Sequence, residues 1–267
     1  MRPLHISFEG VRDIFAAMQF EQISGVPLSD VIGGGDPEYV ASEILAVMAK
    51  YVDLPSQDSI LDVGCGCGRI ATGFTQYLSP TSRYLGVDIV SELIEFCKKF
   101  ISPRYPNFRF VLLEEGNLTY DWWRQKSSQI DLAKLSEAQP PGTVDLAISI
   151  SLFTHLDLPA ATDILATIAR MLKNGGRAFI TFFVLDSGAR EGIENGRTGF
   201  SFKHRTSSGE LHAEKLEDPT HAVAYEMGQI EALVHSVGLQ LERWVPGYWS
   251  HGNTGETFQD ALILRYA

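Results

Sequence analysis

The sequence lacks several features that would assign it to a particular class of protein. It has no apolar run near the roughly 20 residues that a membrane-spanning helix requires, and residues 1–5 lack the apolar core of a secretory signal. It also has no run of lysine and arginine, and its formal net charge is −11. These absences argue against membranes and nucleic acids as partners, because nucleic acids are bound by clustered positive charge.

Cysteine is scarce as well. Three cysteines cannot form a complete disulfide framework, so we expect a reducing, cytoplasmic location. Cys65 and Cys67 have the spacing of half a zinc site, but Cys97 is the only other thiol, and no metal is predicted. Three irregularly spaced histidines are interpreted as solvated loop residues rather than ligands: His204, His212 and His221.

From residue 59 onward the sequence alternates apolar strands with amphipathic helices. Such alternation predicts a parallel sheet covered by helices on both faces, while a closing strand pair without a helix between its members should be antiparallel. The expected fold is therefore α/β, a Rossmann-like doubly wound sheet of about seven strands, mostly parallel with an antiparallel last strand. The expected strands are 59–63, 83–88, 108–113, 144–150, 177–184, 239–246 and 258–266.

The sequence predicts where several helices begin and end. The expected starts are Asp36 with Pro37, Ser91, and Asp157 with Pro159. The helix that starts at Asp157 should end at Lys173–Gly176, and a last helix should span 225–237. The first thirty residues should form one or two short helices with three candidate packing residues, Phe15, Met18 and Phe20.

The most informative segment follows the first strand of this alternation. Asp62 leads into the loop Val63–Gly68, which has glycine at every second position and precedes a helix. Bare backbone allows a ligand to approach closely, and a helix N-terminus favours a carboxylate or phosphate. Asp88 ends the next strand, where an acid suits a ribose diol. Together these signals predict a nucleotide-type cofactor, although a dinucleotide fingerprint would have glycine where this chain has Arg69.

The pattern Asp-x-Gly-x-Gly-x-Gly resembles motif I of class I S-adenosylmethionine-dependent methyltransferases. Phe258-Gln259-Asp260 is similar to a segment found in a subset of bacterial type 11/12 members. The resemblance covers residues 60–185 and, more loosely, 225–266. Three further segments resemble the fourth strand, a Phe-x-His-Leu of small-molecule members and the turn into the fifth strand: Val144–Ser151, Leu152–Leu156 and Met171–Arg177.

This resemblance implies S-adenosyl-L-methionine as cofactor and S-adenosyl-L-homocysteine as product. The loop amides and Asp62 would hold the methionine part, and Asp88 would bind the ribose. Ser151 would close the site under the methionine. The implied cofactor-binding residues are Asp62, Val63, Gly64, Cys65, Gly66, Gly68, Arg69, Asp88, Ile89 and Asn117 (the last two at the adenine) and Ser151.

The chemistry requires little from the protein beyond positioning. The methyl group on a sulfonium is electrophilic, so transfer is an in-line displacement in which a general base is optional. His155, just past a central strand, is the candidate base; the alternative is a ring that hydrogen-bonds to the backbone and shapes the pocket. Tyr225 is the second catalytic candidate, facing the substrate, and packing is its alternative.

The organisation that we predict is a single methyltransferase domain over residues 1–267. Connections of roughly two to six residues are usual in α/β units, and the segments 115–142 and 186–224 are far longer. The expected parts are an N-terminal helical lid at 1–58, a cofactor-binding core at 59–185, a substrate-recognition insertion at 186–224, and a C-terminal helix and strand pair at 225–267.

Several residues carry two interpretations. Gly34 and Gly35 form either a lid over the cofactor or a plain loop before a capped helix. Trp122 and Trp123 form either a partner surface or a cover for the sheet edge. Three aromatic residues pack either over a ring-shaped acceptor or in the core: Trp244, Tyr248 and Trp249.

The acceptor that we predict is a small molecule, methylated at an oxygen of a natural product or a sugar, by a protein that could be a homodimer. The chain has no Asn/Asp-Pro-Pro-Tyr, no cysteine after proline, and no acidic metal ligands at 149–151. An NAD(P)-dependent oxidoreductase is a rival, disfavoured by Arg69 and by the absence of a Tyr-x-x-x-Lys pair. A catalytically silent S-adenosylmethionine-binding protein is another rival, which the sequence leaves open.

Overall fold

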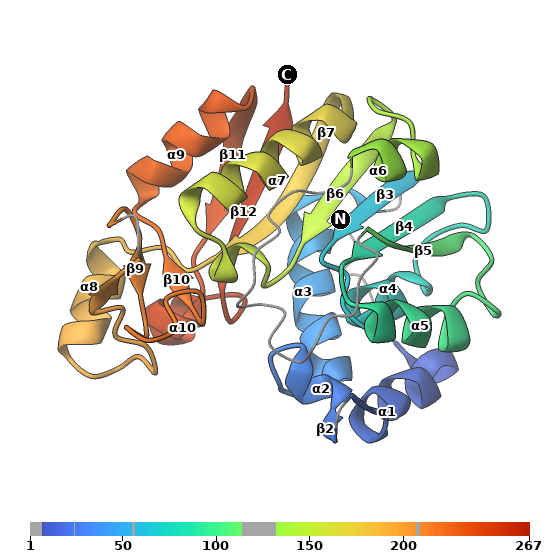
Figure 1. Ribbon diagram of the computed structural model, residues 1–267, viewed down its shortest axis with the longest axis horizontal. Helices are drawn as coiled ribbons and strands as arrows, with labels where there is room; N and C mark the ends of the chain where they lie inside the picture. Colours follow the sequence, from blue (N-terminus) through green and yellow to red (C-terminus); the bar gives the residue numbers. More distant parts are fainter. Residues whose placement is uncertain (1–6, 24, 55–56, 114–131, 207–208) are drawn as a thin grey trace. The chain divides into compact units, whose positions relative to one another are not determined.

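The structure is a computed structural model that describes residues 7–23, 25–54, 57–113, 132–206 and 209–267 (Figure 1). These residues divide into two compact units. The first contains the described residues up to 113 together with 137–139, and the second contains 132–136 and the described residues from 140 onward. Among the helices described, none combines the length and apolar character needed to cross a bilayer.

The sheet of the first unit has three parallel strands, β3 (Ser59–Val63), β4 (Arg83–Asp88) and β5 (Phe108–Leu112). All five residues of β3 are buried, as expected for a strand covered on both faces. The helices α4 (Arg69–Phe74) and α5 (Ser91–Phe100) connect these strands, and α5 packs on β4 and β5 (Figure 1).

Short elements precede β3 in the first unit. They are the 3-10 helix η1 (Glu9–Val11), α1 (Arg12–Phe20), β1 (Gln22–Ile23), β2 (Val26–Pro27), α2 (Leu28–Val31) and α3 (Pro37–Tyr51). Phe15 and Met18 of α1 are buried as predicted, whereas the prediction that Phe20 packs is wrong, because 78% of its surface is exposed. The helix α3 packs on α4, the helix that follows the glycine loop.

The sheet of the second unit begins with β6 (Val144–Ser149), which is parallel to β7 (Leu172–Phe182). The last strand, β12 (Asp260–Tyr266), is antiparallel both to β7 and to β11 (Leu239–Val245). Three helices accompany these strands: α6 (Leu132–Ala138), α7 (Leu158–Met171) and α9 (Met227–Ser236).

The strand order is β11-β12-β7-β6-β3-β4-β5 in a seven-stranded sheet. It confirms the prediction of a mostly parallel α/β sheet with an antiparallel last strand and helices packed around it. Because β12 pairs antiparallel with β7, the backbone hydrogen bonds of β7 are satisfied on that side without a further crossover helix.

The segment 186–224, predicted as a substrate-recognition insertion, contains small elements of its own. A three-stranded antiparallel sheet pairs β8 (His204–Arg205), β9 (His212–Ala213) and β10 (Val223–Ala224). Beside it lie α8 (Ser187–Glu194) and α10 (Tyr248–His251) (Figure 1), and α10 is followed by the 3-10 helix η5 (Gly252–Thr254). A second apolar core joins them, made of Phe183, Leu185, Ala189, Phe202, Ala222, Ala224 and Trp249.

Helix ends follow local chemistry in most cases. The carboxylates of Asp36 and Asp157 cap α3 and α7 as predicted, each accepting a backbone N–H in the first turn. The prediction of a Ser91 cap is wrong: Ser91 is already inside α5, because Asp88 bonds the Val90 N–H and forms the turn itself.

The end of α7 also differs from the prediction. The helix stops at Met171 rather than at Lys173–Gly176, because Leu172 already pairs with Val144 of β6. An ion pair between Lys173 and Asp145 holds the start of β7 on β6. Gly175 then takes a positive φ of 75° where the register shifts, so the glycines form an irregularity inside a strand.

Candidate active site

The glycine loop after β3 is a turn in the left-handed region of backbone space. Gly64, Gly66 and Gly68 have φ values of 77°, 56° and 76°, which side chains other than glycine adopt only with strain. A Cβ on Gly68 would lie 2.5 Å from the Cδ1 of Ile101 and 3.0 Å from the Sγ of Cys97. The alternation of glycines therefore has both a conformational and a steric cause.

Hydrogen bonds fix this turn to the end of β4. The N–H groups of Gly64 and Cys65 both donate to the carbonyl of Val87, at 2.9 and 3.1 Å. The N–H of Gly66 donates to Oδ2 of Asp88 at 2.9 Å. These amides already have acceptors in the protein. What the turn offers a ligand is therefore close approach to the backbone and a carboxylate at its side.

Asp88 and the glycine turn are the two signals that the sequence predicts to act together, and the structure brings them into direct contact. Oδ1 of Asp88 also accepts the Val90 N–H at 3.0 Å, so both oxygens of the carboxylate are oriented. Burial raises the pKa of Asp88, although the backbone N–H groups of Gly66, Val90 and Ile89 counteract the shift. A buried, oriented carboxylate with lone pairs to spare is suited to bind hydroxyl donors.

Asp62 lies behind the turn rather than on its open side. Its side chain is buried and accepts a short hydrogen bond from the hydroxyl of Tyr84 on β4. Burial raises the pKa of Asp62 to about 7; the Tyr84 bond lowers it and the charge of Asp88 raises it. The carboxyl group is therefore buried and joins the end of β3 to a side chain at the start of β4.

Arg69 connects the turn to the segment with consecutive glycines. Its guanidinium donates to the carbonyls of Gly34 at 3.3 Å and Ile32 at 3.4 Å, and the side chain is buried. Burial also lowers the pKa of Arg69 from its ordinary value. A Cβ on Gly66 would lie 3.1 Å from the Cγ2 of Ile32. The segment predicted as a lid or a plain loop thus packs directly on the glycine turn.

The carboxyl end of β6, in the second unit, carries a different turn. Ser151 has a φ of 61°, one of two positive values among the described non-glycine residues, and such a conformation costs of order 1–3 kcal/mol. Its N–H donates to Oγ1 of Thr181 at 2.8 Å, and its hydroxyl donates to Oε1 of Gln259 at 3.1 Å. The sequence predicts a role for Ser151 but gives no signal for Thr181 or for the position of Gln259.

His155 ends the 3-10 helix η4 (Phe153–His155), four residues past Ser151. Its Nδ1 lies 3.1 Å from the carbonyl of Thr220. A carbonyl only accepts, so Nδ1 carries the proton and Nε2 of the neutral ring keeps its lone pair. The pKa of His155 is lowered, chiefly by loss of water around its ring. The two alternatives for His155 are therefore compatible, since the backbone bond sets the tautomer that a base needs.

Tyr225 packs in the interior, which agrees with the second of the two interpretations that the sequence left open for it. Its ring is fully buried in an edge-to-face contact with Phe182, with centroids 5.1 Å apart. Its hydroxyl donates to the carbonyl of Leu156 at 2.7 Å. Burial raises the pKa of Tyr225 well above its ordinary value. The residue fixes the chain just after His155 and is unsuited to exchange a proton.

Two of the tryptophans converge on a buried carboxylate. Asp260, at the start of β12, accepts the indole N–H groups of Trp249 at 2.6 Å and Trp244 at 3.2 Å. It also accepts the backbone N–H groups of Gly247 and Val184, both at 2.9 Å. Four donors satisfy the carboxylate completely. Packing is therefore the interpretation that fits Trp244 and Trp249.

The rim of the second apolar core remains accessible. Tyr248 and Phe258 keep 37% and 42% of their surfaces exposed, and their ring centroids are 5.6 Å apart. Phe258 in turn lies edge-to-face against the buried Phe183. An aromatic surface therefore adjoins Gln259.

The histidines of the insertion do not gather around one point. His212 bonds Oε1 of Glu226 at 2.9 Å, and Arg190 forms an ion pair with the same oxygen. In the described part of the chain, no group of three or more His, Cys, Asp and Glu side chains is placed to hold a metal ion. Three of the residues singled out in the sequence lie outside the described residues: Asn117, Trp122 and Trp123.

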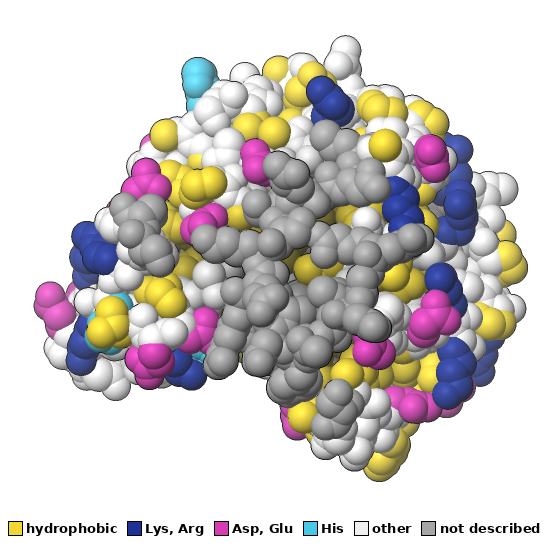
Figure 2. Space-filling view, in the orientation of Figure 1, with side chains coloured by type: hydrophobic (Ala, Val, Ile, Leu, Met, Phe, Trp, Pro, Cys, Tyr) yellow, Lys and Arg dark blue, Asp and Glu magenta, His cyan; other side chains and the backbone are white. Residues whose placement is uncertain are grey.

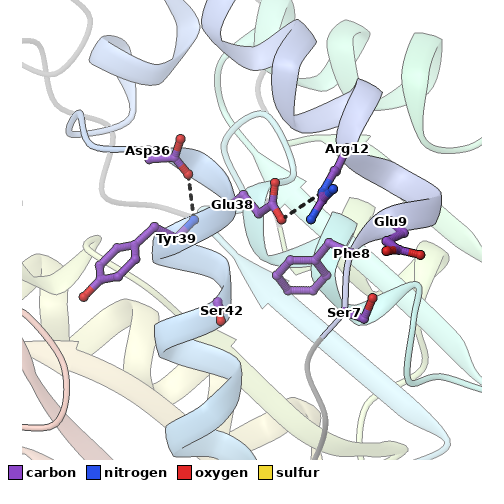
Figure 3. A pocket seen from close by; sticks show the side chains of 8 residues that line it. All are labelled: Ser7, Phe8, Glu9, Arg12, Asp36, Glu38, Tyr39 and Ser42. Atoms are coloured by element: carbon purple, nitrogen blue, oxygen red, sulfur yellow. Dashed lines mark hydrogen bonds and ion pairs between the residues drawn. The ribbon is translucent and has the colours of Figure 1, made fainter.

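Two pockets of the described residues have linings of their own. A surface groove of about 500 Å³ runs between η1, α1 and the start of α3, where Arg12 pairs with Glu38 at 3.5 Å (Figure 3). A smaller pocket of about 130 Å³ lies in the insertion, beside Arg190 and His212. Neither is lined by Asp88 or by the glycines of the turn.

The part of the chain that is similar to known proteins contains the glycine turn and Asp88. Residues 60–176, from β3 to the start of β7, match the family described as "Methyltransferase domain". A protein-L-isoaspartate O-methyltransferase from Methanothrix thermoacetophila is 26% identical over 141 residues, which are 52% of this chain and 54% of that protein. The chain spans about half the length, or less, of the curated relatives that it matches.

Two solved structures share the fold at 16% sequence identity. One is a protein from Pyrococcus horikoshii OT3, with a TM-score of 0.58 over 88% of this chain and 92% of that one. The other is the Burkholderia thailandensis 1,6-didemethyltoxoflavin-N1-methyltransferase with bound 1,6-didemethyltoxoflavin and S-adenosylhomocysteine, with a TM-score of 0.53 over 85% and 78% of the two chains. The glycine turn and Asp88 thus lie in the part of the chain that matches a methyltransferase domain, and the two solved structures share its fold.

Proposed function

We propose that this protein transfers the methyl group of S-adenosylmethionine to an oxygen of a small organic acceptor, a natural product or a sugar. The observation that carries the cofactor half is the hydrogen bond between Gly66 and Asp88, which joins a glycine turn to an oriented carboxylate. The observation that carries the oxygen acceptor is His155, whose Nδ1 bond leaves Nε2 free to accept a proton.

The residues of the first unit fit this cofactor. The left-handed glycines leave the backbone bare where a Cβ would intrude, and Asp88 accepts hydroxyl donors at the end of β4. Asp62 acts from behind the turn through Tyr84, and Arg69 holds the segment of Gly34 against it. The complete set that we propose for the cofactor is Asp62, Val63, Gly64, Cys65, Gly66, Gly68, Arg69, Asp88, Ile89, Asn117 and Ser151.

The reaction needs positioning first and a base second. When bound, the cofactor supplies a methyl group on a sulfonium, whose sulfur leaves as a neutral thioether when an acceptor oxygen attacks the methyl carbon in line. An uncharged hydroxyl must lose its proton as the new bond forms, and a neutral histidine with a lowered pKa is suited to take it at pH 7. We therefore assign the base to Nε2 of His155, and we assign no proton transfer to Tyr225.

The acceptor class rests on the second unit. Residues 186–224 build a small sheet over an apolar core, and Tyr248 and Phe258 extend its rim with exposed aromatic rings. Such a surface suits a flat or apolar acceptor. A net charge of −11 and the interspersed acidic and basic side chains on the face in Figure 2 disfavour nucleic acid.

A second candidate function is methylation of a carboxylate on a protein. It is favoured by the relatives named protein-L-isoaspartate O-methyltransferase. A carboxylate acceptor is already ionised at pH 7, so it needs no base. His155 thus discriminates the two candidates, because only transfer to a hydroxyl depends on it.

The experiment is methyl transfer from methyl-labelled S-adenosylmethionine to a panel of hydroxylated aromatics, sugars and an isoaspartyl peptide. We expect a hydroxylated compound to be labelled, and His155→Gln to lower kcat by about 10²–10⁴-fold with unchanged affinity for S-adenosylhomocysteine. The matched control is His235→Gln on the exposed surface of α9. Labelling of the peptide alone, unaffected by His155→Gln, would replace this proposal by the second candidate.

A further inference from the structure

Three side chains from distant parts of the second unit form a closed set of hydrogen bonds at the carboxyl end of β6. Thr181, fully buried in β7, accepts the Ser151 N–H at 2.8 Å and donates to Oε1 of Gln259 at 2.6 Å. The hydroxyl of Ser151 donates to the same Oε1 at 3.1 Å. Gln259 immediately precedes β12, which pairs with β7.

The direction of these bonds is determined by the donors available. Thr181 has a single hydroxyl proton, and its oxygen already accepts the Ser151 N–H, so the proton is free to go to Gln259. A side-chain carbonyl has two lone pairs, and Gln259 uses both, one for each hydroxyl. The acceptor atom of Gln259 is thus specified by its two neighbours.

The residue that receives this support has unfavourable backbone geometry. Ser151 has a φ of 61°, where a residue with a Cβ is strained and persists only when its surroundings hold it. Its carbonyl is held as well, by the hydroxyl of Thr154 at 3.0 Å. The turn at Ser151 leads into η4, which carries His155. The conformation of Ser151 therefore sets the direction in which the chain enters η4.

We propose that Gln259 is a positioning residue of the methyl-transfer site, which acts by holding Ser151 in its left-handed conformation. This inference rests on the proposed function, in which Ser151 contributes to the cofactor site. Gln259 does not itself contact the cofactor in this account. Without its carbonyl, Ser151 relaxes to a negative φ and the turn after β6 changes direction.

The test combines substitutions at both ends of the contact, with S-adenosylhomocysteine as the probe in calorimetry. Gln259→Met keeps the length of the side chain but cannot accept a hydrogen bond, and we expect it to raise the Kd about tenfold. Gln259→Glu keeps an oxygen that accepts both hydroxyls, and we expect a Kd within about twofold of the starting protein. Gln240→Met, on the exposed face of β11, is the control for the same change elsewhere.

The decisive variant is Gln259→Met in a Ser151→Gly background. Glycine adopts a positive φ without strain, so the support of Gln259 should become dispensable and the double variant should bind like Ser151→Gly alone. A tenfold loss in both backgrounds would overturn the inference, because Gln259 would then act independently of the Ser151 backbone. No loss in either background would overturn it as well.

A crystal structure of Gln259→Met supplies a readout that does not depend on binding. We expect φ of Ser151 to become negative, and an unchanged positive φ would contradict the inference. If the starting protein binds no S-adenosylhomocysteine, the proposed function fails, while the φ of Ser151 in the variant still decides whether Gln259 holds this turn.

Discussion

Two strands of this protein end in left-handed turns, and the two turns are built differently. After β3 the chain uses Gly64, Gly66 and Gly68, with φ values of 77°, 56° and 76°. After β6 it uses Ser151 at 61°, held by side chains 30 and 108 positions away in the sequence. Glycine needs no help in this region, whereas serine does. The first turn is therefore encoded locally and the second by tertiary contacts.

The largest effect should follow from a single methyl group in the first turn. Gly68→Ala adds a Cβ that meets Ile101 and Cys97 in a strained conformation, so we expect a loss of about 2–5 kcal/mol of unfolding free energy. Urea denaturation measures it. Gly142→Ala is the matched control, since Gly142 has a φ of 72° but nothing within 4 Å of an added Cβ. Equal losses in the two variants would mean that the turn is not closely packed.

The ends of the two strands also differ in their response to pH. Asp62 lies two residues before Gly64, whereas the position two before Ser151 is the buried, uncharged Ser149. The pKa of Asp62 is about 7 in the fold and near 3.8 in the unfolded chain, so the carboxyl is protonated in the fold over this interval. Its contribution to stability is complete below pH 4 and is lost as pH rises from 4 to 7.

We expect the unfolding free energy of the ligand-free protein to fall by about 1.4 kcal/mol per pH unit near the middle of that window, and by about 2–4 kcal/mol in total. Asp62→Asn removes the titration and should flatten this part of the profile, as measured by urea denaturation from pH 4 to 8. Ser149→Ala should leave the slope as it is. A slope that survives in Asp62→Asn would assign the titration to another group.

A smaller effect is expected where the first turn meets the ligand. Asp88→Asn replaces one carboxylate oxygen by an NH2 group, which only donates hydrogen bonds. The side chain then has one oxygen fewer to accept the Gly66 N–H and a ribose hydroxyl. We expect S-adenosylhomocysteine to bind about 1–3 kcal/mol more weakly. Asp58→Asn, a change of the same kind ahead of β3, should leave the Kd as it is. An unchanged affinity of Asp88→Asn would mean that the ribose is bound elsewhere.

The smallest effect concerns the strain in the second turn. Ser151→Gly and Ser151→Ala both lose the hydroxyl bond to Gln259, but only glycine relieves the positive φ. We therefore expect the glycine variant to be more stable than the alanine variant by about 1 kcal/mol, a difference that thermal denaturation resolves. Alanine is ordinarily the more stabilising of the two residues. A Ser151→Ala variant more stable than Ser151→Gly would therefore show that Ser151 is not strained.

The same contrast explains what the sequence could reveal. The glycine loop and the caps at Asp36 and Asp157 are local patterns whose chemistry acts within a few residues, and Asp88 is recognisable by its place at the end of the next strand. The structure contains all of them. The parallel pairing follows from the alternation of apolar strands and helices, and the antiparallel direction of β12 is confirmed.

The failures lie where another residue or another strand competes with the local pattern. Ser91 resembles a cap, yet Asp88 forms that turn first. The glycines at 175 and 176 resemble a helix stop, yet pairing with β6 begins at Leu172. Tyr225 appears at a helix start in the sequence, but its hydroxyl donates a hydrogen bond to the carbonyl of Leu156, 69 positions away. The partnership of Ser151 with Gln259 has no local signal at all.

The central claim is that the glycine turn and Asp88 bind an S-adenosylmethionine-type cofactor. Calorimetric titration of the whole chain with S-adenosylmethionine, S-adenosylhomocysteine, NADH and NADPH in parallel tests it directly. We predict micromolar binding of the first two, loss of that affinity in Asp88→Asn, and no binding of either nicotinamide cofactor. Binding of NADH or NADPH, with none of S-adenosylhomocysteine, would contradict the account.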